Sequence, residues 1–194
     1  MAKEITTPRF LKEYKLWRAC AKDDSRDALN YICFDNGYAY ATNGHIIAKV
    51  GLNTLTALLE DDEKKMLDGF CIHADVYKAL VQYANIQVIS NGEKVQIVCP
   101  VNKNTVTFEL VAKQEVLTPN YESMFKAEGE SHPIEKIGLA KNYLNDLTAA
   151  LGLDRIKMDF YSESAKIIVS PINEEYLDIK GLIMPIMTTG TMDF

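Results

Sequence analysis

Three Asn-Gly pairs, at residues 36–37, 43–44 and 91–92, divide much of the chain into short apolar runs. Asn-Gly is the pair that most favours a two-residue β-hairpin turn, because both turn positions need a positive φ. The runs beside these pairs are rich in Val, Ile and Tyr, which favour strands. We therefore predict antiparallel strands joined by tight turns. The expected strands are residues 29–34, 38–42, 45–50, 86–90, 94–99 and 105–112.

Segments with helical spacing of apolar residues precede each group of strands. This spacing predicts helices at residues 9–22, 73–84 and 139–151. The order of one helix followed by antiparallel strands then occurs about three times, which predicts an α+β fold of repeated units. One such unit cannot bury its sheet alone, so we expect the units to pair. The strands expected after the last helix are 155–161, 165–170, 175–179 and 181–187.

The segment KAEGESHPIE, residues 126–135, is rich in Gly, Glu, Ser and Pro and is the best linker in the chain. We expect two helix-plus-sheet units in residues 1–126, a linker at 127–135 and a third unit in residues 136–194. The expected domain boundaries therefore fall between the repeated helix-plus-sheet units.

The composition, 47% hydrophobic and 25% charged, is that of a folded protein. No apolar run approaches the roughly 20 residues that span a bilayer, and the N-terminus lacks the apolar region of a secretion signal. We therefore expect a cytoplasmic protein without a membrane partner. The net charge of −6 argues against indiscriminate nucleic-acid binding.

The sequence carries no motif that predicts an enzyme. A Gly-x-Ser-x-Gly turn, a phosphate-binding loop and a His-Glu-x-x-His pair are all missing from it. The four cysteines are too far apart for a Cys-x-x-Cys metal site, and we expect buried, reduced thiols. His73 and His132 have no evident Cys or Asp partner. We therefore expect no catalytic residue, no metal and no cofactor.

Three separated stretches resemble the DNA sliding clamp of bacteria, the β subunit of DNA polymerase III. Ala41–Ala48 (ATNGHIIA) resembles the Ala-Thr-Asp-Gly-His-Arg-Leu-Ala of that family. Leu117–Tyr121 (LTPNY) is similar to its Arg-Phe-Pro-Asp-Tyr, and Leu182–Ile186 (LIMPI) is similar to its terminal Val-Val-Met-Pro-Met. The resemblance covers most of residues 8–187. Because the family has six units and this chain about three, the chain resembles a contracted clamp.

In that family the three stretches meet in an apolar groove, where polymerases, clamp loaders and repair proteins dock a short linear motif. Two simpler readings stay open: His45 satisfies a strand-end carbonyl, or the segment from Met184 to Met187 is a core strand. Ile46 and Met187 replace arginines of the family, which lowers the attraction for acidic peptide residues. The resemblance implies peptide-binding roles for Thr42, Gly44, His45, Ile46, Ile47, Pro119, Tyr121, Met184, Pro185, Ile186 and Met187.

A clamp slides because Lys and Arg on its inner helices contact phosphates loosely, without reading bases. The expected helix at 9–22 has a basic stripe that fits this requirement, although an ordinary solvated helix face would look the same. The candidate DNA-facing residues are Lys12, Lys15, Arg18 and Lys22.

The sequence therefore predicts a sliding-clamp-like replication accessory protein, a processivity factor that tethers a polymerase to double-stranded DNA without sequence specificity. The alternative is a clamp-derived peptide-binding module that does not encircle DNA. The oligomeric state distinguishes them, because a family ring contains twelve units and three units per chain would require a homo-oligomer of four chains.

Overall fold

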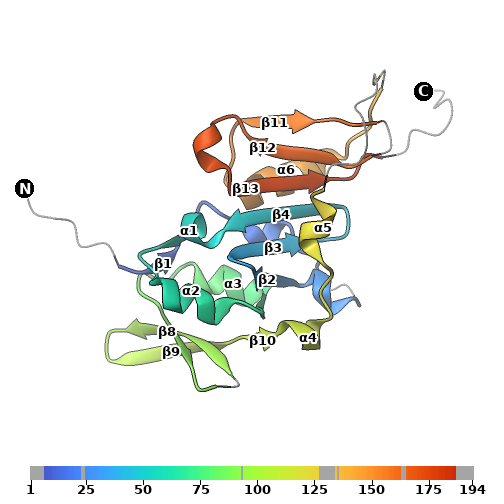
Figure 1. Ribbon diagram of the computed structural model, residues 1–194. Helices are drawn as coiled ribbons and strands as arrows, with labels where there is room; N and C mark the ends of the chain where they lie inside the picture. Colours follow the sequence, from blue (N-terminus) through green and yellow to red (C-terminus); the bar gives the residue numbers. More distant parts are fainter. Residues whose placement is uncertain are drawn as a thin grey trace, which may run out of the picture.

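The computed structural model describes residues 7–22, 25–92, 94–126, 134, 136–162 and 165–186, and its centre is one large antiparallel sheet (Figure 1). This sheet has the strand order β10-β6-β2-β3-β4-β13-β12-β11. Its strands are β2 (Tyr31–Asp35), β3 (Tyr38–Thr42), β4 (Ile46–Gly51), β6 (Phe70–His73), β10 (Val111–Ala112), β11 (Ile156–Asp159), β12 (Ile167–Pro171) and β13 (Ile179–Ile183).

Two smaller sheets accompany it. One is the three-stranded sheet of β7 (Gln87–Ser90), β8 (Val95–Val101) and β9 (Asn104–Glu109). The other is the pair of β1 (Arg9–Phe10) with β5 (Thr56–Ala57). The helices are α1 (Leu52–Leu55), α2 (Asp61–Leu67), α3 (Ala74–Leu80), α4 (Lys113–Val116), α5 (Tyr121–Met124) and α6 (Lys141–Leu151), with 3-10 turns η1 (Leu16–Arg18), η2 (Asp27–Leu29) and η3 (Glu174–Tyr176).

The two faces of the large sheet are buried under different elements. The first face, covered by α3, α6 and η1, holds the main core; in β4 it receives Ile46, Ala48 and Val50. The opposite face, here called the outer face, holds a smaller cluster that includes Ile47 and is partly covered by α5 (Figure 1). This alternation follows from the two-residue period of a strand. It separates the residues of a single strand between two distinct surfaces.

Strand β13 joins the end of the chain to the first strands. It pairs with β4 from Ile179↔Val50 to Ile183↔Ile46, so the sheet is continuous across this junction. Helix α6 packs over both strands, and it approaches β13 closely at Gly181. A Cβ atom on Gly181 would lie 2.8 Å from the Leu151 side chain and 2.9 Å from that of Leu147. An added methyl group at this position would therefore force these two leucine side chains to shift.

The helix predicted at residues 9–22 does not form. The segment instead contains β1, a turn and the short η1. Its N–H groups bond to distant carbonyls: Leu11 donates to Leu55 and Lys15 donates to Ala149. These tertiary bonds replace the bonds that a helix would make, so tertiary packing overrides the local helical pattern.

The other predicted elements form with shifted ends, and one strand is wrong. The expected strand 175–179 is replaced by η3, and β13 begins at Ile179 instead of residue 181. The expected strand 105–112 is divided, because β10 leaves β9 and pairs with β6. Of the predicted linker 127–135 only Ile134 lies within the described residues, so the division into domains stays a prediction.

The close approach at Gly181 predicts a sensitive position. Gly181→Ala should lower the free energy of unfolding by about 1–3 kcal/mol, because the added methyl group displaces the buried Leu147 and Leu151 side chains between α6 and β13. Lys180→Ala, one residue earlier on an exposed side chain, is the matched control and should change it by less than about 0.5 kcal/mol. Urea unfolding followed by circular dichroism measures both. Equal stability of the two variants would contradict the packing described here.

Candidate functional site

A row of side chains crosses the outer face of the sheet where its early and late strands meet. Thr42 lies opposite Ile47, Ile47 lies opposite Leu182, and Leu182 lies opposite Ile168. Directly opposite residues point to the same face of an antiparallel sheet. Three of them, Thr42, Ile47 and Leu182, form the floor of a cavity of about 500 Å³, here called the outer groove.

The walls of the outer groove come from three other parts of the chain. Pro119, Ser123 and Met124 line it from the segment that enters and forms α5. Met184 lines it just after the end of β13, with its side chain 41% exposed. The remaining lining residues are Leu29, Gly44, His45, Ala165 and Lys166. The groove is therefore a mainly apolar surface with polar groups at its rim.

The turn at residues 42–46 fixes the rim by local hydrogen bonds. The Asn43 side-chain oxygen accepts bonds from the N–H groups of His45 (2.9 Å) and Ile46 (3.0 Å). The Thr42 hydroxyl donates to the Ile46 carbonyl (2.6 Å). Only Gly44 of the Asn43-Gly44 pair has a positive φ, whereas both Asn36 and Gly37 do. The Asn43 turn is therefore built on side-chain bonds and differs from the predicted type I′ hairpin.

His45 joins this rim to α6 and to the end of β13 in two ways. Its carbonyl accepts a hydrogen bond from the N–H of Met184 (2.9 Å). Its exposed ring stacks on Tyr143 of α6, with ring centres 4.7 Å apart and 11° between the planes. Both contacts hold the turn against α6 and the end of β13, and His45 also lines the outer groove.

The α5 wall is fastened to the sheet by a buried lysine. Lys49 of β4 is 7% exposed, and its ammonium group lies 2.5 Å from a carboxylate oxygen of Glu122. The same group lies 3.9 Å from the centre of the Tyr38 ring and 5.7 Å from that of Phe125. An ammonium group surrounded by a carboxylate and aromatic faces is favourable when largely desolvated. This cluster therefore positions the segment that carries Ser123 and Met124.

The residues proposed for peptide binding do not all reach the outer groove. Thr42, Gly44, His45, Ile47, Pro119 and Met184 line it. Ile46 is fully buried on the helix-covered face, and Tyr121 is buried and stacked on Tyr40. Pro185 and Ile186 follow Met184 without lining the cavity, and Met187 lies outside the described residues. Side chains alternate between the two faces of a strand, so the sequence alone could have shown that Ile46 and Ile47 point to opposite faces.

Sequence reasoning missed several lining residues. Leu182 lies within the Leu182–Ile186 stretch but has no predicted binding role, although it is the β13 residue opposite Ile47. Ser123 and Met124 follow the Leu117–Tyr121 stretch directly, so the beginning of α5 was an available signal. Leu29, Ala165 and Lys166 carry no local signal, because only the tertiary arrangement brings them to the groove.

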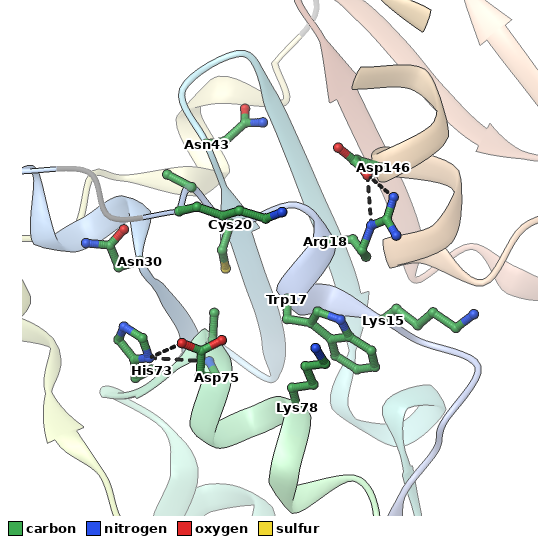
Figure 2. Close-up of a pocket in the computed structure, with 13 residues that line it drawn as sticks. Lys15, Trp17, Arg18, Cys20, Asn30, Asn43, His73, Asp75, Lys78 and Asp146 are labelled. Atoms are coloured by element: carbon green, nitrogen blue, oxygen red, sulfur yellow. Dashed lines mark hydrogen bonds and ion pairs between the residues drawn. The ribbon is translucent and has the colours of Figure 1, made fainter. Parts of the chain in front are cut away.

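A second cavity, of about 890 Å³, lies on the helix-covered side of the molecule and is here called the basic pocket (Figure 2). Lys15, Arg18 and Lys22 line it from the N-terminal segment, and Lys78 lines it from α3. Trp17 contributes an aromatic face beside Lys15 and Lys78 (Figure 2). Lys12 does not line the pocket, so the structure brings together only part of the predicted basic stripe.

The basic pocket also holds carboxylates. Asp146 of α6 accepts two hydrogen bonds from the Arg18 guanidinium group, from Nε at 2.8 Å and from Nη2 at 2.5 Å (Figure 2). Asp75 lies beside His73 at the start of α3. Within the described part of the chain, no acidic partner is recorded for Lys15, Lys22 or Lys78. These three cations give the pocket an excess of positive charge.

The described residues contain no cluster of three or more His, Cys, Asp or Glu side chains that could hold a metal ion. All four cysteines are free and buried. Burial raises the pKa of the Cys99 thiol to about 11 and also raises that of Cys20, which disfavours the reactive thiolate. Among the described helices, none has the length and apolar character needed to cross a membrane.

Comparison with solved structures establishes the fold. The DNA polymerase III β subunit of Pseudomonas aeruginosa matches with a TM-score of 0.60 at 15% identity, over 96% of this chain and 69% of that chain. The H. pylori β clamp in complex with diflunisal matches with a TM-score of 0.61 at 12% identity, over 96% and 68% of the two chains. The Streptococcus pyogenes β subunit matches at 0.54 and 14% identity, over 96% and 67%.

No protein-family model matches the chain, and no curated protein matches it by sequence. At such low identity the structural likeness concerns the fold. The chain thus has the DNA sliding-clamp fold, built from helices and antiparallel sheets in a contracted form, and the predictions of fold class and resemblance are confirmed.

The buried lysine predicts how the α5 wall responds to its loss. Lys49→Met should increase amide hydrogen exchange in residues 119–125, because α5 loses its ion pair and its contact with the aromatic rings, while β2 and β3 stay protected. Lys113→Met removes a comparable ion pair, with Asp35 at 2.6 Å, and should affect α4 instead. Mass spectrometry of exchanged peptides separates the two. Unchanged exchange at 119–125 in the Lys49 variant would remove this anchoring role.

Proposed function

We propose that the chain is a sliding-clamp-like DNA replication accessory protein that binds partner peptides in the outer groove and contacts DNA through its basic pocket. One observation carries the proposal. Three stretches that are far apart in the sequence, around Thr42, Pro119 and Met184, meet at a single cavity in a molecule with the clamp fold. A core-packing role alone does not require them to surround an open cavity.

The outer groove suits a short peptide with one or two Leu or Phe anchors. Its floor is apolar, and Met124 and Met184 can adjust to different anchors because thioether side chains are flexible. A cavity of about 500 Å³ is in the range of small-ligand sites, roughly 300–1,000 Å³. The exposed ring of His45 at the rim offers a polar contact to the peptide backbone. The expected partners are a DNA polymerase and other replication or repair proteins.

The basic pocket suits the phosphate backbone of double-stranded DNA. Lys15, Lys22 and Lys78 supply charge without a fixed hydrogen-bond pattern, which favours contact that is independent of base sequence. Because the chain carries a net charge of −6, this attraction is local and depends on orientation. The pocket and the groove lie on opposite faces of the large sheet, so peptide and DNA can be bound together.

The peptide proposal predicts that a rim methionine contributes to binding. Met184→Ala should weaken binding of a fluorescein-labelled peptide with Leu and Phe anchors by about 1 kcal/mol or more, roughly fivefold in Kd. Met66→Ala is the matched control, because Met66 is 37% exposed on α2 and remote from the groove lining. Fluorescence anisotropy with a library of such peptides measures both Kd values.

Two results would contradict the peptide proposal. The first is that no library peptide binds the wild-type chain with a Kd of about 1 mM or lower. The second is binding that Met184→Ala and Met66→Ala weaken equally.

The DNA proposal predicts a change in salt dependence. Lys15→Glu combined with Lys78→Glu should weaken binding to duplex DNA and lower the slope of log K against log salt by about 2, since each lost phosphate contact lowers it by about 1. Lys103→Glu, in the exposed β8–β9 turn, is the control for a general change of charge. Binding is measured by anisotropy of a labelled duplex from low to moderate salt.

The outcome of this titration also decides between the two forms of the proposal. If the pocket variant and the control have equal slopes, the basic pocket does not contact DNA. If the wild-type chain binds peptide but no DNA at low salt, the alternative applies: a clamp-derived peptide-binding module that does not encircle DNA.

A further inference from the structure

Strand β11 is the outer edge of the large sheet. It pairs with β12 on one side, and no described strand pairs with its other side (Figure 1). The opposite edge strand, β10, is two residues long, whereas β11 extends over four. An edge strand of this length presents unpaired N–H and C=O groups to any chain that can add a strand.

The sequence at this edge is complementary to itself. Residues 156–160 read Ile-Lys-Met-Asp-Phe, with a lysine on one side of Met158 and an aspartate on the other. If a second copy is placed antiparallel with Met158 opposite Met158, each Lys157 lies opposite an Asp159, and each Ile156 lies opposite a Phe160. Opposite charges facing each other across an antiparallel pair stabilise it.

The side chains are placed as this pairing requires. Within one chain Lys157 and Asp159 already form an ion pair of 3.2 Å and are 64% and 40% exposed, so both lie on the same face and remain accessible. Ile156 and Met158 pack against the main core on the other face, and Phe160 is 37% exposed just beyond them. In the paired copies, Lys157 and Asp159 would form ion pairs on one face, and Ile156, Met158 and Phe160 would pack together on the other.

The other long edges lack this pattern. Strand β7 carries no charged residue, and β9 carries only Glu109. Lysine on an edge strand often prevents pairing, because two lysines then face each other. Here the antiparallel arrangement about Met158 puts an aspartate opposite each lysine, so the charge favours a second copy of this chain over a chain of arbitrary sequence.

We propose that β11 is a self-association edge, through which two copies of the chain pair antiparallel about Met158 and extend the eight-stranded sheet across a twofold axis. The interface is isologous, meaning that both copies use the same surface. This proposal is independent of the peptide and DNA proposals, because β11 lines neither the outer groove nor the basic pocket. If the self-association proposal fails, the peptide and DNA proposals are unaffected. If the peptide or DNA proposal fails, the self-association proposal is unaffected.

The test uses charge reversal and sedimentation equilibrium of the full chain. Lys157→Asp and Asp159→Lys should each raise the dimer dissociation constant about tenfold or more, because each replaces two attractive cross-strand pairs by two repulsive ones. An equimolar mixture of the two variants should recover the dimer, since a chain with two acids then faces a chain with two lysines. The double variant should dimerise like the wild type, because the exchange preserves self-complementarity.

Asp62→Lys and Lys65→Asp are the matched controls. They reverse the charges of another exposed ion pair, of 3.1 Å on α2, and should leave the dissociation constant unchanged. Thermal unfolding followed by circular dichroism confirms that each variant is folded. Readings are made over a wide range of concentration and at two salt concentrations, because the wild-type dimer should weaken as salt rises.

Three results would overturn the proposal. A wild-type chain that stays monomeric at every concentration removes the interface. Single variants that associate as the wild type does show that association uses another surface. Variants that lose association but do not recover it on mixing show that β11 pairs with a different strand, as in a head-to-tail assembly.

Discussion

The pairing of β4 with β13 is the interaction on which the rest of the structure depends. It joins residues 46–50 to residues 179–183 and makes one sheet from two distant parts of the chain. The floor of the outer groove is a row of residues that crosses this junction, and Met184 is held at its rim by the His45 carbonyl. On the other face, α6 covers both strands and brings Asp146 to Arg18 in the basic pocket. Both candidate sites therefore depend on the same strand pairing.

The period of two along a strand explains how one sheet supports two different surfaces. Adjacent residues of β4 alternate between the main core and the outer face, so Ile46 is buried under α6 while Ile47 forms the groove floor. Ile46, the residue after His45, therefore belongs to the main core. It does not line the outer groove.

Most of the sheet could be predicted from the sequence, because Asn-Gly turns and runs of strand-forming residues are local signals. The strand predicted at 38–42 matches β3, and the one at 45–50 begins one residue early. The segment at 9–22 could not be predicted in this way. Its apolar spacing is helical, and Phe10 and Tyr14 are buried. However, the N–H groups of Leu11 and Lys15 bond to the carbonyls of Leu55 and Ala149, which lie far along the chain.

The residues of the two candidate sites were likewise predictable from the sequence only where a local motif marks them. The residues that line the outer groove from within the three quoted stretches were accessible to sequence reasoning, because each stretch carries a motif. Leu29, Ala165 and Lys166 were not, because they reach the groove only through tertiary packing. The basic pocket was found in part: Lys15, Arg18 and Lys22 line it although the helix that suggested them does not exist, and Lys78 joins them from α3.

The distance in sequence between β4 and β13 has a consequence during synthesis. The ribosome releases β4 long before β13, and until residues 179–183 emerge, one edge of β4 lacks its partner strand. Pairing of strands so far apart also closes a long loop, which makes it a late and slow event in folding. The nascent chain therefore lacks the Leu182 part of the groove floor and the Met184 rim. The outer groove is therefore complete only after residues 179–184 have been synthesised and have paired with β4.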